Sequence, residues 1–599
     1  MLHERPKMTN SNPFSDPNLP SLEWLRDTIA ARYDIPHQRR MDMVSACNMA
    51  GRWFDLPLAM IPANAAFLRE RFKNFHHIHA GVSKTRVGNV KSLLLAAMRE
   101  AGLSITLAPY QSKLTPAWQT LYDRISDNYR RPALSRFMRY CSRNDIAPDA
   151  VCDAVASSYL KALETESLIR HPRTNQQTLC RVWNQCADVI DGWPDLRLTV
   201  PRYEDRLYAI SDELINPALL AEIETYIGYL EGKDLFTGRA RPFRPKSIKA
   251  VRGHIRRYLS ALHHSGFDVS AITDLQEMVA FETFKQAMRW FWERNGQKTS
   301  RSIGEVAWTM RCIAVKHLAC DEEMTASYKE ALATLRLREP GLSPKNRAAL
   351  QQFDDAAAAG RFLGLPDLLW SLAEKERGKK AQLLVQSAIT IEILMFAPLR
   401  IDNLTSLRLD RHLAWIDDRL HINLPAGEVK NRMDLHYVLP RGTTERVRVY
   451  IDNWRSLFLP AANPHLFPGR NNKAKDISCL RRQITRALFG HTGIRLTPHM
   501  YRHVAAKLLL DARPGYYEVV RKVLGHKNLA TTYEHYAGAE TQAAVELYDD
   551  VILGLKRGGN GSVRNDRHHR PEETSRQAPE KDDLPFLDPL NLFAQGHAA

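Results

Sequence analysis

Residues 497–502 read Thr-Pro-His-Met-Tyr-Arg, and this stretch predicts a helix whose first turns carry chemistry. A threonine followed by a proline is typical of a helix start, because threonine caps the first turn and proline is tolerated at the first helical position. His499 and Arg502 stand three positions apart, so they share one face of that helix. The positive end of the helix dipole adds to their charge, which favours a phosphate. His503, beside Arg502, is predicted to point elsewhere and to be structural.

Short motifs on either side of this helix carry further polar residues. Arg400 follows the apolar run Leu383–Met395 and a Pro-Leu pair, an unusual place for a mere surface charge, and it opens a new amphipathic helix. Downstream, a Leu-Gly-His motif ends at His526 and closes a short helix, because Gly525 is a left-handed stop signal. Each motif alone has a structural explanation, such as a helix-surface arginine. Their order along one chain favours a function.

The residue types suit attack on a phosphodiester. Such an attack builds negative charge on the phosphoryl oxygens, so catalysis consists mostly of positioning and electrostatic stabilisation. The planar fork of an arginine can grip two oxygens at once, and we therefore predict that Arg400 and Arg502 clamp the phosphate. His499 can accept or relay a proton, and His526 can donate a hydrogen bond. No His, Asp or Glu cluster has metal-ligand spacing, so the sequence predicts no metal and no cofactor.

The polar residues follow one order along the chain: Arg400, Lys430, His499, Arg502, His526 and Tyr536. This pattern resembles the tyrosine recombinase (phage integrase) family, strongly over residues 345–557 and weakly over 205–340. Nothing specific is recognised before residue 200. The resemblance implies that Tyr536 is the nucleophile, because the family places its tyrosine nine or ten residues after the Leu-Gly-His motif, behind two threonines. Tyr533 and Tyr548 are the alternatives.

Lys430 is assigned by the same resemblance. It lies in a predicted hairpin turn, where a long cation can reach into a groove, and the hairpin lysine of the family is proposed to protonate the leaving 5′ oxygen. Arg432 is the neighbouring alternative. The implied reaction links the 3′ phosphate covalently to the tyrosine and frees a 5′ hydroxyl. Because that link stores the phosphodiester energy, religation needs no ATP.

The resemblance further implies a site-specific recombinase or integrase that acts on double-stranded DNA. It would be a monomer when free and a tetramer on DNA, with other recombinases or accessory DNA-bending proteins as further candidate partners. The length of the chain and its extra N-terminal part favour a large mobile-element integrase that serves integration, excision or transposition. A type IB topoisomerase and a catalytically inactive DNA-binding relative are the alternatives. The spacing from the Leu-Gly-His motif to the tyrosine disfavours the first, and six competent residues disfavour the second.

The composition fits a polyanionic partner. The 599 residues carry a formal net charge of +17 with a pI near 9.5, and each phosphate that such a protein neutralises releases counterions. The eight cysteines form no Cys-x-x-Cys pair, which disfavours a zinc ribbon and suits a reducing cytoplasm. No stretch approaches the ~20 apolar residues of a membrane span, and the first residues do not form a signal peptide. We therefore expect a cytoplasmic, nucleoid-associated protein without membrane contact.

The chain is predicted to be mainly α-helical with a small antiparallel β-sheet, in several domains. The expected parts are a flexible tail at 1–20, a helical region at 21–200 that contacts arm DNA or other protomers, a helical core-binding DNA domain at 205–340, a catalytic domain with the DNA breaking-rejoining fold at 345–557, and a disordered tail at 558–599. A linker is expected at Gly341–Asn346. Short strands are expected at His412–Ile416, Leu420–Leu424 and Leu435–Leu439.

One helix of the predicted core-binding domain carries a basic face. Within Ser247–Gly266, apolar residues recur with helical spacing, and cations three and four positions apart form a neighbouring stripe. The residues predicted to contact DNA are Lys246, Lys249, Arg252, Arg256 and Arg257. Similar apolar stripes at Ser83–Gly102 and Thr174–Ala187 are either diverged copies of one module or ordinary amphipathic helices.

Overall fold

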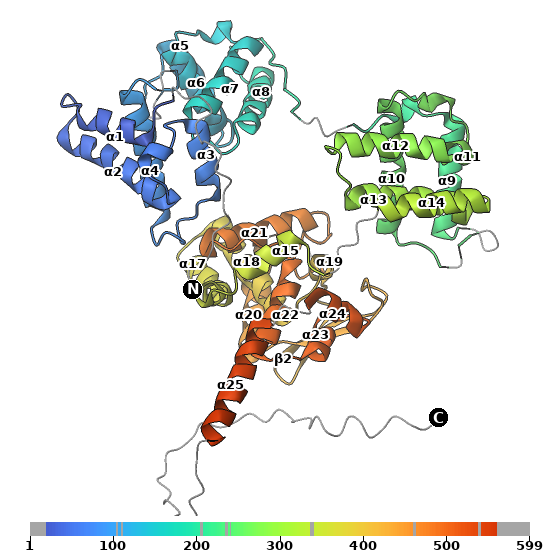
Figure 1. Ribbon diagram of the computed structural model, residues 1–599. Helices are drawn as coiled ribbons and strands as arrows, with labels where there is room; N and C mark the ends of the chain where they lie inside the picture. The colour runs from blue at the N-terminus through green and yellow to red at the C-terminus, as the bar shows by residue number, and fades with distance from the viewer. Residues whose placement is uncertain are drawn as a thin grey trace, which may run out of the picture.

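The computed structural model describes residues 19–103, 106–108, 112–203, 208–233, 238–239, 241–335, 341–458, 463–536 and 541–559. Helices dominate these residues, and one three-stranded antiparallel sheet accompanies them. This confirms the predicted fold class. Figure 1 shows the helices gathered into separate bundles along the chain.

Two helical bundles, blue and cyan in Figure 1, form the first third of the chain, and each has its own apolar core. In the second bundle, the buried rings of Trp118 and Trp183 lie 6.2 Å apart at its centre. The helices of the first are α1 (Leu22–Ala30), α2 (His37–Phe54), α3 (Ala65–Asn74) and α4 (Lys84–Glu100). Those of the second are α5 (Pro116–Arg124), α6 (Arg130–Arg143), α7 (Asp153–Glu166) and α8 (Pro172–Val189).

A third bundle, green in Figure 1, surrounds the amphipathic helix predicted at Ser247–Gly266. That helix, α10, buries Ile248, Ile255 and Leu259, which lie on the apolar face seen in the sequence. The helices of this bundle are α9 (Pro217–Glu231), α10 (Pro245–His264), α11 (Leu275–Met278), α12 (Phe281–Arg294), α13 (Arg301–Arg311) and α14 (Glu322–Leu335).

The C-terminal part surrounds the apolar helix α18 (Gly378–Phe396), which is buried along most of its length, as expected for Leu383–Met395. The other helices of this part are α15 (Pro344–Gln351), α16 (Ala356–Leu363), α17 (Leu365–Glu374), α19 (Ile401–Ser406), α20 (Arg441–Val449), α21 (Ile477–Thr492), α22 (Met500–Ala512), α23 (Tyr517–Leu524), α24 (Leu529–Tyr536) and α25 (Thr541–Gly559). Of these, α17, α20, α21 and α22 pack against α18.

The sheet of the C-terminal part is a meander with strand order β1-β2-β3. Its strands are β1 (Leu413–Ile416), β2 (Arg419–Leu424) and β3 (Leu435–Val438), and neighbours are antiparallel. Along β2, Leu420, Ile422 and Leu424 are buried while Asn423 between them is exposed, the alternation of a strand with one face on a core. All three predicted strands are confirmed to within one residue at each end.

Three consecutive helices bring the C-terminal motifs together. His499 is the N-cap of α22, and α23 ends at Gly525, whose φ of +59° lies in the left-handed region. A Cβ at this glycine would stand 2.3 Å from Leu435 Cδ2 in β3, so a larger residue would have to displace Leu435 as well as adopt the left-handed backbone that glycine favours. The chain then enters α24, whose last residue is Tyr536.

Two expectations about chain organisation change. The linker predicted at Gly341–Asn346 is wrong in its second half, because Ser343 caps α15 and Pro344 is its first residue. Helix α25 reaches Gly559, two residues into the predicted disordered tail. The remainder of both predicted tails, residues 1–18 and 560–599, lies outside the described residues. Within the part that is described, no helix has the length and apolarity to cross a membrane.

Candidate active site

Five of the six predicted catalytic residues line one cavity of about 260 Å³ between the β2–β3 turn and α22, α23 and α24. They are Arg400, His499, Arg502, His526 and Tyr536. The rest of the lining consists of Asn431, His503, Lys527, Thr531 and His535. It therefore holds several cationic or protonatable side chains and no carboxylate. A concave site of this charge suits an anion.

The two arginines are held in different ways. Arg502 is buried, and its Nη1 donates to Pro398 O at 2.7 Å while its Nη2 donates to Leu524 O. Arg400 is half-buried, and its Nη2 donates to Asn431 Oδ1 at 3.1 Å. Its Nη1 is buried with no hydrogen-bond partner among the described residues. A buried donor without a partner costs free energy, so this nitrogen is placed for an acceptor from outside the chain.

Burial also weakens the protonation of both guanidinium groups. It lowers the pKa of Arg502 to about 10, and the nearby charge of Arg400 adds to the shift. Burial likewise lowers the pKa of Arg400. A bound phosphate would counter these shifts, because an anion compensates both the lost hydration and the repulsion between like charges.

Asn431 ties the hairpin to the site, a role that the sequence analysis missed. Besides accepting from Arg400, its side chain donates through Nδ2 to Gly525 O at 2.9 Å. Tyr437 in β3 adds a second link, because its hydroxyl donates to Val523 O at 2.8 Å. The β2–β3 turn is therefore bonded to the end of α23. The only signal in the sequence was the position of Asn431 beside a predicted catalytic residue.

Lys430, the sixth predicted catalytic residue, lies in the same turn. Its side chain is exposed and does not line the cavity. Its positive charge is nevertheless close enough to contribute to lowering the pKa of His499. The turn thus places Lys430 at the edge of the cavity rather than inside it.

Burial and nearby positive charge favour the neutral form of two histidines at the cavity, His526 and His499. Burial lowers the pKa of His526 to about 4, with Arg502 and Arg400 adding to the shift, and its Nδ1 lies 3.0 Å from Thr532 Oγ1. His499 stands at the rim, where partial burial of the ring, followed by the charges of Arg502 and Arg400, lowers its pKa. An anion in the cavity would raise both pKa values, so phosphate binding favours proton uptake here.

His503 corrects the sequence analysis, which predicted that it points away from the site. It lines the cavity, and its Nδ1 lies 2.7 Å from the hydroxyl oxygen of Tyr536. The reason is helical geometry: His503 follows His499 by four residues, about one turn of α22, and the two ring centroids are 5.2 Å apart. Burial lowers the pKa of His503 to about 3, so its neutral ring can accept a hydrogen bond from the phenol.

The structure separates the three candidate tyrosines. Tyr536 is buried at the cavity, and burial raises its pKa. Tyr533 is 45% exposed and stacks on Tyr517 with ring centroids 4.2 Å apart. Tyr548 is exposed on α25. Only Tyr536 among these three lines the cavity.

Comparison with known proteins matches the part of the chain that holds this cavity. The model of the phage integrase family matches residues 371–543, which include all six predicted catalytic positions. This part of the chain belongs to the tyrosine recombinase family. Tyrosine recombinase XerC of Pseudomonas aeruginosa is 29% identical over 178 residues, which are 29% of this chain and 55% of that protein. XerC of Azotobacter vinelandii is 29% identical over 165 residues, 27% of this chain and 50% of that protein.

The matched part of the chain, residues 371–543, is called the recombinase domain from here on. The similarity covers only part of this chain and part of each curated relative. The chain spans about half the length of the curated relatives it matches. Among solved structures, XerA recombinase is 17% identical with a TM-score of 0.25, covering 55% of this chain and 98% of that one. The Tn1549 transposon integrase in complex with circular intermediate DNA is 15% identical with a TM-score of 0.31, covering 50% of this chain and 99% of that one.

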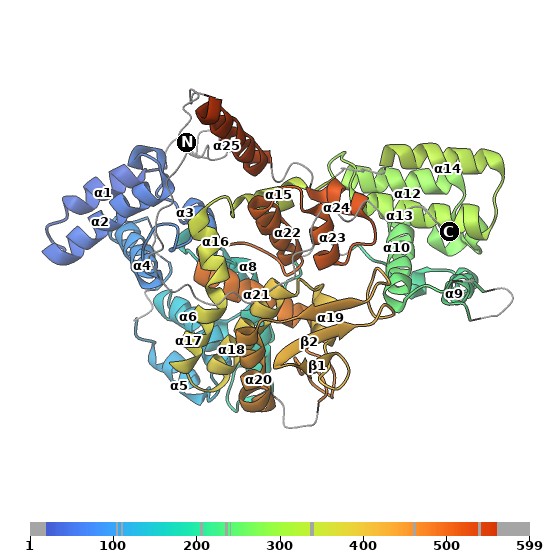
Figure 2. The same cartoon turned by 90° about the horizontal axis from the view of Figure 1, so that it is seen from below.

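Helix α10 lies next to the recombinase domain in Figure 2, and Arg244 at its start donates to Val429 O at 3.0 Å. Four of its five predicted DNA-contacting cations already have partners. Lys246 pairs with Asp402, Arg252 with Glu224 and Arg256 with Asp212, while Arg257 donates to Ser302 Oγ. Lys249 is exposed and has no ion pair in the described part of the chain. DNA contact by this helix stays a prediction.

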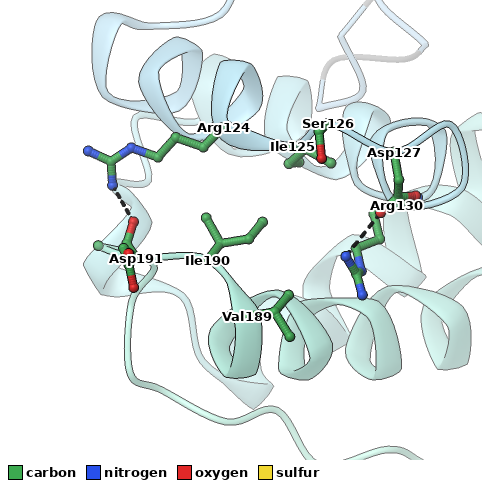
Figure 3. Close-up of a pocket in the computed structure, with 9 residues that line it drawn as sticks. Arg124, Ile125, Ser126, Asp127, Arg130, Val189, Ile190 and Asp191 are labelled. Carbon is green, nitrogen blue, oxygen red and sulfur yellow. Dashed lines mark hydrogen bonds and ion pairs between the residues drawn. The ribbon is translucent and has the colours of Figure 1, made fainter.

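A larger cavity, of about 600 Å³, lies outside the recombinase domain in the second bundle. Figure 3 shows its two arginines engaged with their own chain: Arg124 donates to Asp191 O at 2.8 Å, and Arg130 pairs with Asp127 at 3.1 Å. The carboxylate of Asp127 therefore partly neutralises Arg130, whereas no carboxylate lines the cavity around Tyr536. Elsewhere in the described residues, no group of three or more His, Cys, Asp or Glu side chains is placed to hold a metal ion.

Proposed function

We propose that the protein is a site-specific DNA recombinase that cleaves and rejoins double-stranded DNA through a covalent bond between Tyr536 and a 3′ phosphate. The observation that carries this proposal is the carboxylate-free cavity that Tyr536 shares with Arg400 and Arg502. A nicked duplex drawn from the DNA that flanks the gene tests it. A covalent adduct is expected, and its absence under conditions of full duplex binding contradicts the proposal.

In the proposed cleavage step, Tyr536 Oη forms a bond to phosphorus while the bond from phosphorus to the 5′ oxygen breaks. Arg400 and Arg502 stabilise the charge that builds on the non-bridging oxygens, and His526 donates a further hydrogen bond. The free Nη1 of Arg400 is the donor with the clearest need for such an oxygen. His499, at the rim, can relay a proton.

Two protons move in this step. The phenol of Tyr536 must lose one, although burial disfavours its ionisation, and the neutral His503 ring lies 2.7 Å away to take it. The leaving 5′ oxygen must gain one, and Lys430 at the edge of the cavity is the proposed donor. In religation the 5′ hydroxyl attacks the phosphotyrosine, and both protons move back.

Replacement of His503 by alanine tests the proton acceptor. We expect covalent capture to slow by about a hundredfold, because general base assistance typically contributes that much. Duplex binding should stay at the wild-type level, since His503 is neutral and reaches the phenol rather than the solvent. Single-turnover capture as a function of pH is the measurement. A wild-type rate and pH profile in His503→Ala would show that the histidine only fills space.

Cleavage is expected to proceed in excess EDTA. Arg400 and Arg502 supply at the cavity the positive charge that a metal ion supplies in other phosphoryl-transfer sites. The measurement is adduct yield with and without chelator. Loss of the adduct on chelation, with recovery when magnesium is added, contradicts a metal-independent reaction.

The proposed recombinase binds DNA from two sides. The recombinase domain contacts one side of the duplex, and the third bundle contacts the other through α10, where Lys249 has no ion pair among the described residues. The helical region before residue 200 governs site choice or contacts between protomers. Figure 1 shows α25 projecting from the domain. The side chains of Val545, Tyr548 and Leu555 on this helix are exposed, and burial of such a surface favours a tetramer on DNA. Sedimentation of DNA complexes saturated with protein measures the number of protomers in each complex. Four protomers on two DNA sites are expected, and a single protomer contradicts the tetramer.

A role in a mobile element is the more specific part of the proposal. Its support is the size of the chain, because two helical bundles precede the segments that the family resemblance covers. The DNA around the gene tests it. Terminal repeats or neighbouring recombinase genes are expected, and their absence from both flanks contradicts a mobile-element role.

A further inference from the structure

A second cationic cavity, of about 460 Å³, lies where the first helical bundle meets the recombinase domain. Its walls come from α3, α4, a segment near Arg170 and the last turn of α21. Direct contacts between the two parts hold this junction together. The rings of His76 and Phe489 lie 4.6 Å apart, and Arg495 Nη2 donates to Lys73 O at 3.0 Å. Figure 1 shows the first bundle beside α21.

The charge of this junction cavity is unbalanced. Its lining holds five Lys or Arg residues and two His, and no Asp or Glu. Two of the five are engaged: Arg69 donates to backbone carbonyls such as Ser167 O, and Lys73 pairs with Glu70. Lys84, Lys91 and Arg170 have no carboxylate partner among the described residues. Burial and neighbouring positive charges also lower the pKa of His76 to about 4. Such a concentration of like charge is costly unless an anion enters.

Two glycines, one near the start of α4 and one in the last turn of α21, leave the same cavity open. Gly88 of α4 and Gly490 of α21 both line it, and a Cβ at either position would meet no atom within 4 Å. Glycine inside a helix costs about 1 kcal/mol relative to alanine, so neither helix favours it for its own stability. Bare backbone on two facing helices permits close approach of a ligand.

The aromatic rings around the cavity argue against stacking with a base. Lys91 Nζ lies 4.7 Å from the centroid of Phe72, and the guanidinium of Arg495 lies 4.8 Å from that of Phe489. Phe75 stacks on Trp53 with centroids 4.8 Å apart. Single-stranded nucleic acid and nucleotides depend on free aromatic faces, whereas the backbone of a duplex depends on cations.

We propose that this junction cavity binds the phosphate backbone of duplex DNA at a second place, apart from the bond that Tyr536 attacks. The inference rests on the proposed function, because it assigns a second contact to the same DNA. Lys84, Lys91 and Arg170 neutralise the phosphates, and the backbone of the duplex passes over Gly88 and Gly490. Because the walls come from both parts of the chain, DNA bound there would fix the first bundle on the recombinase domain.

The test uses the full-length protein and a long random-sequence duplex, with affinity measured by fluorescence anisotropy over a salt series. Gly88→Glu and Gly490→Glu each place a carboxylate in the cavity from a different wall, without a steric obstacle at Cβ. Each should weaken binding about five- to tenfold at moderate salt and reduce the slope of log K against log salt by about one. Gly442→Glu in α20 is the matched control: its Cβ is also unobstructed, and it does not line the cavity.

Folding of the variants is checked by circular dichroism and thermal unfolding, and all three should unfold at or above the wild-type temperature because glutamate favours helix over glycine. Lys84→Gln is a second variant that removes one charge without adding a carboxylate, and it should lower the salt slope in the same direction. Affinity and slope equal to the Gly442→Glu control in all cavity variants overturn the proposal.

Two further outcomes are distinguished by separate probes. Inorganic tripolyphosphate tests a free phosphate ligand. If it raises the unfolding temperature of the wild type but not of Gly88→Glu, while duplex affinity is unchanged, the site takes free phosphates and the assignment to DNA is overturned. Covalent capture on the nicked duplex by saturating protein reports on the recombinase reaction alone. If the cavity variants capture the nicked duplex as the wild type does and show the same salt dependence as Gly442→Glu, the junction site is contradicted. The proposed function is then unaffected.

Discussion

Replacement of Tyr536 by phenylalanine is expected to abolish covalent capture of DNA while leaving duplex affinity within about twofold of wild type. The hydroxyl is the attacking group, and a hydroxyl that is absent cannot form the bond to phosphorus. Affinity resides in phosphate contacts made by cations, which the substitution leaves in place. Trapping on a nicked duplex, followed by a denaturing gel, is the measurement.

The matched control for this variant is Tyr533→Phe. Tyr533 is exposed and stacks on Tyr517, and a phenylalanine ring can keep that stack. It should therefore capture DNA at the wild-type rate. Loss of the hydrogen bond between Tyr536 and His503 costs about 1 kcal/mol of stability, so the Tyr536→Phe protein is expected to fold. An adduct that survives in Tyr536→Phe and disappears in Tyr533→Phe reverses the assignment.

Arg400→Lys and Arg502→Lys are expected to lower the single-turnover cleavage rate by about a hundredfold each, although both keep the positive charge. A lysine is a point charge and cannot reproduce a two-oxygen fork, and a missing donor costs about 3 kcal/mol of barrier. Arg400→Lys is the cleaner of the two. Arg502 also holds Pro398 O and Leu524 O, so its loss disturbs the packing of α22 against α23 as well.

Arg408→Lys serves as the control within the same domain. Arg408 forms an exposed ion pair with Asp410 at 2.6 Å and does not line the cavity. The cleavage rate of Arg408→Lys should therefore equal that of the wild type. Rates within about threefold of wild type in Arg400→Lys, where a hundredfold loss is expected, would show that its guanidinium does not grip the phosphate. Unfolding temperatures of all three variants separate lost chemistry from lost structure.

Local signals in the sequence predicted much of this fold. The apolar length of α18, the alternation along β2 and the stop at Gly525 each depend on neighbouring residues, and each is confirmed. The candidate site was predictable for the same reason: its residues lie in short motifs at helix ends and in one turn. The confirmed part is the fold, while the catalytic roles stay predictions.

Contacts between distant residues account for what the sequence did not reveal. Asn431 joins Arg400 to the backbone of Gly525, two partners that lie 31 and 94 positions away. The ion pair of Arg252 with Glu224 spans 28 positions and occupies a cation that was predicted to face DNA. The junction cavity unites segments more than 300 residues apart, and no local pattern marks it. His503 is different, because its spacing of four from His499 did carry the signal.

The most direct test of the account is to identify the residue that becomes linked to DNA. The captured complex is digested with nuclease and trypsin, and the peptide from Asn528 to Lys556, which contains Tyr533, Tyr536 and Tyr548, is fragmented in a mass spectrometer. We expect the remaining nucleotide on Tyr536 alone. A nucleotide on either of the other two tyrosines, or on a residue outside this peptide, would contradict the account.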